Sequence, residues 1–280
     1  MTGLPKRYRQ QITSMTIILV VALWCLGPIL WIGVTSLKPQ GTEMRAPVEF
    51  WPQEPTLDNY RLVTGERFTV QRSVLNSVII SGTAMIGTLL LATSAAYAIA
   101  RLRFRSRYQS LYLMQIAGMV PPIVIIAPTF VLLRWLGLLR TYWAMILPNM
   151  VYSIPLASFL IAGYLSSVPF EIEDSGKVDG AGTFTIIFRL IFPVAAPGIF
   201  SAGILAFMSN FGEFMLANVV SFGERAIEPV TTTIMSLSRA FELQWTWVAA
   251  ATIVTMSPIV VFVIVFQRVL VQGLTAGGIR

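Results

Sequence analysis

The chain has 280 residues, of which 55% are hydrophobic and only 12% are charged, whereas an ordinary soluble domain has about 25% charged residues. This composition favours a bundle of membrane helices over one or two soluble domains. The net charge of +7 comes without a long basic run, so positive charge kept on the cytoplasmic side of a membrane explains it better than nucleic-acid binding. The chain has no histidine and one cysteine, which excludes Ser-His catalysis, histidine-ligated metals and an internal disulfide. Cys25 is expected to be a small buried apolar residue, and no metal site is expected.

About six apolar segments are long enough to cross a membrane as helices, which takes about 20 residues each. In chain order they are residues 15–37, 74–100, 111–133, 143–165, 193–220 and 247–270. The first is too long for the apolar part of a signal peptide and no cleavage site follows it, so it is expected to be a span. Prolines inside the third segment predict a kinked helix that faces other protein. The expected fold class is an all-α polytopic membrane helix bundle, with residues 1–280 forming a single transmembrane domain.

Lysine and arginine in the short loops predict the orientation of the spans. The link at residues 101–107 carries four arginines and no acid, which places it in the cytoplasm together with the basic N-terminus. The loop at 38–72 has equal numbers of basic and acidic residues and is expected outside, as is the segment 221–245. Arg134 and Arg140 lie in a short external link, but four arginines outweigh two. Both termini, including a tail at 271–280, are therefore expected to be cytoplasmic.

The polar segment 166–192, between the fourth and fifth spans, is cytoplasmic by the same parity. Acids follow Pro169 closely and predict the start of a helix, at Glu171, Glu173 and Asp174. Gly180 and Gly182 end that helix, and Thr183 can cap a second one. One face of the second helix is an apolar stripe, with Arg189 lying off it, made of Phe184, Ile187, Phe188, Ile191 and Phe192. Two short helices joined at Gly180 fit a groove on a cytoplasmic partner, but an amphipathic helix that only anchors the loop fits equally well.

The run Asp179-Gly180-Ala181, then Phe188-Arg189, then Pro193 and Pro197, resembles the EAA loop of binding-protein-dependent ABC importer permeases. The Glu-Ala-Ala triplet that names the loop falls on Asp174-Ser175-Gly176, which keeps the charge sign and the small size. Other stretches resemble the branch of this family that includes the maltose permease subunits, so the resemblance covers most of the chain from about residue 15. These stretches are Asn76-Ser77, residues 97–104 and the tail 267–278.

This resemblance implies that the loop is a coupling helix, which docks on an ATPase subunit and transmits its closure. The residues expected to couple to the ATPase are Glu171, Glu173, Asp174, Asp179, Gly180, Ala181, Phe184, Phe188 and Arg189. The implied partners are a second homologous permease subunit, two cytoplasmic ATPase subunits, an external solute-binding protein, membrane lipid and a sugar-like cargo. In the family the tail reaches along the ATPase dimer, a role carried over to residues 273–278. The implied location is the inner membrane of a bacterium or archaeon.

The chain itself shows no nucleotide site. A Walker A loop ends in Gly-Lys-Ser or Gly-Lys-Thr, and the only Gly-Lys pair here, Gly176-Lys177, is followed by Val178. No cofactor is therefore expected in this chain, and ATP and Mg belong on the partner ATPase subunits. The chain is expected to be a non-catalytic transport subunit.

Three polar residues in or near the fifth span are candidates for the translocation path, namely Asn210, Glu213 and Asn218. A carboxylate at membrane depth is costly and usually faces the bundle interior or a water-filled cavity. A structural hydrogen bond to a neighbouring helix explains Glu213 as an alternative, and the asparagines suit interhelical bonds as well as cargo contacts. A secondary transporter driven by an ion gradient is the alternative function, although it predicts ionisable residues in several spans. A membrane enzyme would need a nucleophile and base or a metal set, which the sequence does not show.

Overall fold

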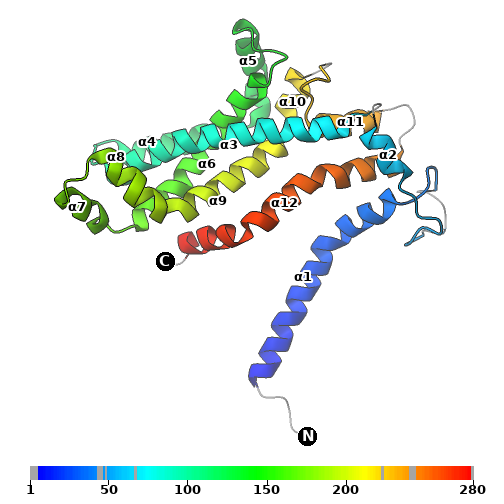
Figure 1. Cartoon of the computed structure of the whole chain (residues 1–280), viewed down its shortest axis with the longest axis horizontal. Helices are drawn as coiled ribbons and strands as arrows, with labels where there is room; N and C mark the ends of the chain where they lie inside the picture. Colours follow the sequence, from blue (N-terminus) through cyan, green and yellow to red (C-terminus); the bar gives the residue numbers. More distant parts are fainter. Residues whose placement is uncertain are drawn as a thin grey trace. The chain divides into compact units, whose positions relative to one another are not determined.

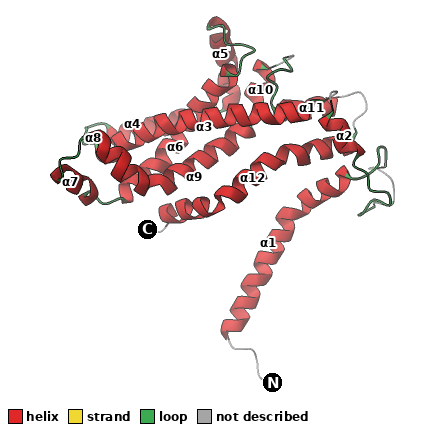
Figure 2. Ribbon diagram, in the orientation of Figure 1, coloured by secondary structure: helices red, strands yellow, loops and turns green. Residues whose placement is uncertain are grey.

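The structure, a computed structural model, describes residues 6–42, 47, 49–65, 68–221, 224–239 and 244–278. In this part of the chain Figure 2 shows helices and loops and no strand. Within these described ranges, five helices are long and apolar enough to cross a membrane, and a sixth span results if one sharply bent helix pair counts as one. The predicted all-α fold with about six spans is confirmed. The end of the predicted cytoplasmic tail, residues 279–280, lies outside the described residues.

The chain divides into two compact units, residues 1–71 with 233–256 and residues 72–232 with 257–280. In the first unit, α1 (Lys6–Ser36) forms the first span. The short helix α2 (Asp58–Thr64) is tied to its end, because the Asn59 side-chain amide donates to the carbonyls of Ser36 and Lys38 over 2.9 and 2.8 Å. The predicted external loop is therefore anchored by hydrogen bonds at the end of the first span.

Cys25 lies exposed on α1, so the expectation that it is buried is wrong. The most apolar stretch of this span has 0% of its residues buried by the protein. The physical reason is that hydrophobicity in a membrane helix reports contact with lipid as readily as contact with protein. The apolar surroundings of a cysteine in the sequence do not distinguish the two.

The second unit is built around the long helices α3 (Val70–Arg101), α6 (Trp143–Ser167) and α9 (Phe192–Phe211), which run side by side in Figure 1. One apolar cluster packs where α3 ends, and its buried members include Ala96, Leu165 and Ile191. Another packs nearer the start of α3 and includes Ile80, Met145 and Leu216. Many buried members are alanines, as is common where membrane helices approach closely.

The third span differs from the expected kinked helix. It consists of α4 (Arg107–Gly118) and α5 (Pro122–Trp135), which meet at an angle of 91°. Pro122 lacks a backbone N–H, and Pro121 is held in an extended conformation by the proline that follows it, with ψ of 130°. The consecutive prolines therefore break the helix instead of bending it.

The fifth span also differs from the expected segment 193–220. A continuous helical stretch, Thr183–Phe211, passes from α8 (Thr183–Thr185) through the π-helix η1 (Ile186–Ile191) into α9. Residues 212–214 then interrupt the helix before α10 (Met215–Val220). The remaining helices are α11 (Val230–Arg239) and α12 (Trp245–Gly278), and the latter contains the sixth span.

Candidate functional site

The first helix of the predicted coupling segment is α7 (Glu171–Val178), which Figure 1 shows near the C-terminal end of α3. Three acids occupy its first turn and Lys177 occupies its last turn. The helix dipole stabilises negative charge at the first turn and positive charge at the last. The Lys177 ammonium lies 2.8 Å from Asp174 Oδ1, and this hydrogen bond raises the pKa of Lys177. Both side chains are mostly exposed, so the pair contributes little to stability. The predicted first helix is confirmed.

The turn after α7 is held by two backbone hydrogen bonds. The N–H of Gly180 donates to the Lys177 carbonyl over 3.1 Å, and the N–H of Ala181 donates to the Gly176 carbonyl over 2.9 Å. Together they form a Schellman motif, which needs a residue with positive φ at the position of Gly180. Gly180 has a φ of 77°, a conformation that glycine adopts without steric strain. The turn at Gly180 is therefore a fixed elbow between the two helices.

Gly176 brings α7 against η1. A Cβ atom added at this position would lie 2.6 Å from Leu190 Cδ1 and 3.2 Å from Ile186 Cγ1. Even an alanine would force these side chains to shift. The small residue at the third position of Asp174-Ser175-Gly176 therefore has a packing reason, which is the close approach of the two helices.

The second helix of the segment is not a separate short helix, because it continues through η1 into the span. Thr183 makes no capping hydrogen bond with its side chain, and Gly182 occupies the cap position, so the predicted threonine cap is wrong. The wide turns of η1 come directly before Pro193, which lacks an N–H and whose ring would clash with the Arg189 carbonyl in a regular α-helix. The proline thus explains why the helix widens.

The aromatic residues of the predicted stripe stack along this helix. The ring centroids of Phe184 and Phe188 are 6.4 Å apart, and those of Phe188 and Phe192 are 5.2 Å apart. Phe184 and Phe188 are exposed, at 79% and 59%, whereas Ile191 is buried in the bundle. The stripe borders an apolar pocket of about 490 Å³ against α3. Within the described part of the chain, Phe184 at the outer end of the stripe stays exposed.

Most of the predicted coupling residues are exposed. These are Glu171, Asp174, Asp179, Gly180, Phe184, Phe188 and Arg189. Ala181 is half-buried, and Glu173 is buried. Glu173 therefore does not belong to the surface that a partner could contact.

Glu173 lies instead against Arg101, the last residue of α3, with 3.0 Å between Arg101 Nε and Glu173 Oε1. The same guanidinium donates from Nη2 to the Val168 carbonyl over 2.9 Å and lies 4.5 Å from the ring centroid of Phe170. Sequence reasoning missed this contact, since Arg101 served only as one of four loop arginines. The signal available was its position at the end of an apolar span, next to a segment rich in acids.

The membrane candidates Asn210 and Glu213 lie together, lining a pocket of only about 10 Å³. Glu213 Oε1 accepts from the N–H of Leu216 over 2.7 Å, and Oε2 accepts from the N–H of Ala217 over 3.0 Å. The carboxylate thus caps α10 just after the break between α9 and α10, where the first N–H groups have no partner within the helix. Such a pocket has room for about one water molecule and not for a sugar.

Asn210 and Asn218 differ in their surroundings. Asn210 is buried, and its Oδ1 accepts from the Ser153 hydroxyl over 2.9 Å, which joins α9 to α6. Asn218 is half-buried on α10 and does not line the pocket that holds Asn210 and Glu213. The structure therefore brings two of the three candidates together.

A polar contact at the start of α3 holds part of the predicted external segment. The Asn76 amide donates to the carbonyls of Ala226 and Glu228 over 3.1 and 3.0 Å, and its oxygen accepts from the Tyr142 hydroxyl over 2.7 Å. These bonds join α3, the start of α6 and the segment before α11. Residues far apart in the sequence thus meet at one buried side chain.

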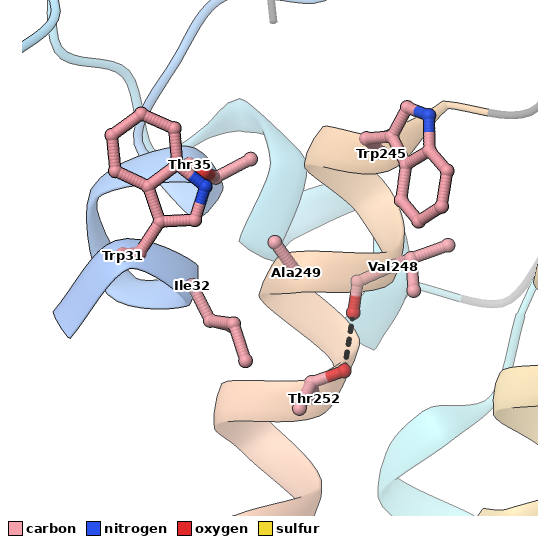
Figure 3. A pocket seen from close by; sticks show the side chains of 7 residues that line it. All are labelled: Trp31, Ile32, Thr35, Trp245, Val248, Ala249 and Thr252. Atoms are coloured by element: carbon pink, nitrogen blue, oxygen red, sulfur yellow. Dashed lines mark hydrogen bonds between the residues drawn. The ribbon is translucent and has the colours of Figure 1, made fainter. Parts of the chain in front are cut away.

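The first unit contains a pocket of about 430 Å³ between α1 and α12. Figure 3 shows Trp31, Ile32 and Thr35 from α1 facing Trp245 and three further residues of α12, with the Thr252 hydroxyl donating to the Val248 carbonyl over 2.7 Å. None of its lining residues is charged. Across the described residues, no group of three or more histidine, cysteine or acidic side chains is arranged to hold a metal ion.

Comparison with known proteins bears on both the fold and the family. The structure of a bacterial ABC transporter involved in the import of alginate superposes with a TM-score of 0.79 at 18% identity, over 96% of this chain and 99% of that chain. A second structure, of an alginate ABC transporter in complex with an alginate-bound periplasmic protein, gives a TM-score of 0.62 at 17% identity, over 95% of this chain and 97% of that chain. At these identities the likeness supports the fold.

Sequence relatives are similar over nearly their whole length. The sulfoquinovosyl glycerol transport system permease protein SmoH of Agrobacterium fabrum is 32% identical over 100% of this chain and 95% of its own. The trehalose transport system permease protein SugB of Mycobacterium tuberculosis is 34% identical over 93% of this chain and 94% of its own. Residues 88–276 match the family described as binding-protein-dependent transport system inner membrane component. The chain therefore belongs to that family, the membrane permeases of ABC importers.

Proposed function

We propose that this chain forms half of the translocation pathway of an ATP-driven importer and couples to a separate ATPase through residues 166–192. The proposal rests on which side of α7 is buried and which side is exposed. Its buried side packs on η1 at Gly176, while its other side presents exposed acids to the surroundings. A helix that only anchored a loop at the membrane would turn an apolar face to lipid, whereas the exposed residues of α7 are mostly charged or polar, with Val178 at its end as the apolar exception.

The proposed cargo is a sugar or a sugar derivative. The relatives named above are permeases for sulfoquinovosyl glycerol and for trehalose, and the structural neighbours import alginate. The proposed partners are a second permease subunit, an external solute-binding protein and two ATPase subunits that carry ATP and Mg. A periplasmic protein is part of one neighbouring structure, which supports the binding-protein partner.

The proposed path passes the break between α9 and α10, where Asn210 and Glu213 line the small pocket and Asn218 follows on α10. This pocket is closed to a sugar, so transport requires the helices around residues 212–214 to move apart. The interruption between α9 and α10 is a suitable place for such movement, because no continuous backbone ladder crosses it. The capping carboxylate keeps α10 formed while it moves.

The test is reconstitution of the permease with its ATPase and binding protein, comparing the unaltered chain with F184A/F188A. We expect the double substitution to remove most of the ATPase stimulation by the loaded binding protein, because the exposed part of the aromatic stripe is lost. F200A is the control, since Phe200 is similarly exposed, at 51%, but lies on α9 outside the segment. Full stimulation with F184A/F188A would contradict this coupling surface, and ion-driven uptake without an ATPase would favour a secondary transporter.

A further inference from the structure

We propose that Arg101 is a positioning residue that locks α7 to the end of α3, so that a movement of α7 is delivered to α3 as well as to α9. This inference rests on the proposed function of α7 as the coupling helix. The carrying observation is one guanidinium with three partners, namely Glu173, the Val168 carbonyl and the ring of Phe170.

The burial of Arg101 is not explained by membrane orientation. A positive charge that keeps a loop in the cytoplasm acts equally well when it is exposed, as Arg103 and Arg105 are. The side chains of Arg101 and Glu173 are only 1% and 8% exposed. Removing two charges from water is costly, so a buried pair needs well-placed partners to persist. Arginine supplies a planar fork of donors that holds several partners in one geometry.

The position of the pair gives it a mechanical consequence. Through the backbone, α7 is joined to α6 by residues 168–170 and to η1 by the turn at Gly180, so these connections can carry a movement to α6 and α9. The helix α3 is far away in the sequence and has no such connection. Tyr97 and Ala100 of α3 share an apolar cluster with Ile172 of α7, but apolar contacts can slide. The buried ion pair, together with the hydrogen bond from Arg101 Nη2 to the Val168 carbonyl, fixes where the start of α7 sits on α3.

The three partners also belong to three different parts of the segment. Val168 follows the last residue of α6, Phe170 precedes α7, and Glu173 lies in the first turn of α7. Arg101 therefore holds the whole entry into α7 and not only one side chain. A rigid entry lets a push on the exposed face of α7 turn into a shift of α3, instead of being absorbed by the linker.

The experiment uses the reconstituted transporter with its ATPase and binding protein, and compares E173Q, R101Q and R101K with the unaltered chain. The measured quantities are the amount of co-purified ATPase and the cargo transported per ATP hydrolysed. We expect the ATPase to co-purify at the unaltered ratio, while transport per ATP falls about tenfold in E173Q and R101Q, within the usual range of coupling between sites. R101K keeps the charge but loses the fork, and an intermediate value is expected. R103Q removes an exposed arginine from the same loop and should change neither quantity.

A second measurement separates positioning from folding. Spin labels at Ser175→Cys on α7 and Ser94→Cys on α3, on a Cys25→Ser background, report the distance between the two helices. We expect one narrow distance distribution with Arg101 and Glu173 intact and a broad one in E173Q. Unchanged transport per ATP together with a narrow distribution in E173Q would overturn the proposal. A lower protein yield of R101K with unchanged cargo transport per ATP hydrolysed would overturn it too, since the pair would then be purely structural. Failure of the unaltered chain to bind an ATPase would instead refute the proposed function.

Discussion

Gly180 and Gly182 stand two residues apart in the turn after α7, yet they make different demands on the backbone. Gly180 has a φ of 77°, whereas Gly182 has a φ of −69°. Both are exposed, and a Cβ atom at either position would meet nothing within 4 Å. The two glycines therefore differ in backbone conformation, whereas the space around an added Cβ atom is open at both positions.

We expect G180A to weaken the elbow by about 1 kcal/mol, because a left-handed conformation costs an L-residue that much, and G182A to be tolerated. The measurement is ATPase stimulation by the loaded binding protein in the reconstituted transporter. A several-fold loss with G180A and no loss with G182A is the expected pattern. Equal behaviour of the two variants would show that the shape of this elbow does not matter for coupling.

Glu213 illustrates how a residue can look functional and also have a structural role. Its two carboxylate oxygens cap α10, so E213Q would retain one acceptor and lose the other. We expect a loss of stability of about 1 kcal/mol, the usual contribution of a helix cap, seen as a lower melting temperature in detergent. E54Q, at an exposed position in the loop between α1 and α2, is the control. An unchanged melting temperature for E213Q would argue against the capping role.

Packing between elements depends on small residues that no periodicity shows. Gly176 lets α7 approach η1, and G176V would place atoms where Leu190 and Ile186 now lie. We expect G176V to push α7 away from η1 and to reduce ATPase stimulation at least several-fold, since overpacking of this kind costs about 1–3 kcal/mol. S175A changes the neighbouring exposed residue and should have little effect. Normal stimulation by G176V would mean that α7 does not need its close contact with η1.

At the scale of the whole molecule, the orientation of the spans is a prediction from loop charge, and cysteine labelling tests it. On a Cys25→Ser background, a cysteine at Gln53 should react with a membrane-impermeant maleimide in intact cells. A cysteine at Ser175 should react only after the membrane is permeabilised. Both positions are exposed, so access across the membrane decides the result. Labelling of Ser175→Cys in intact cells would place α7 outside and remove the basis for coupling to a cytoplasmic ATPase.

Composition and hydropathy determined that this chain is an all-α membrane protein with about six spans, and that the segment after the fourth span is set apart, but they misplaced the start and end of the fifth span. These properties depend on local quantities, namely the length of an apolar run, the charges in a loop, and acids or glycines at a helix end. The tertiary structure decided that Glu173 pairs with Arg101, that Gly176 is a packing position, and that Glu213 caps α10. Arg101 and Glu173 are far apart along the chain, and no local pattern relates them. Only the folded bundle brings the end of α3 to the first turn of α7, because burial of their apolar neighbours places both helices in one cluster.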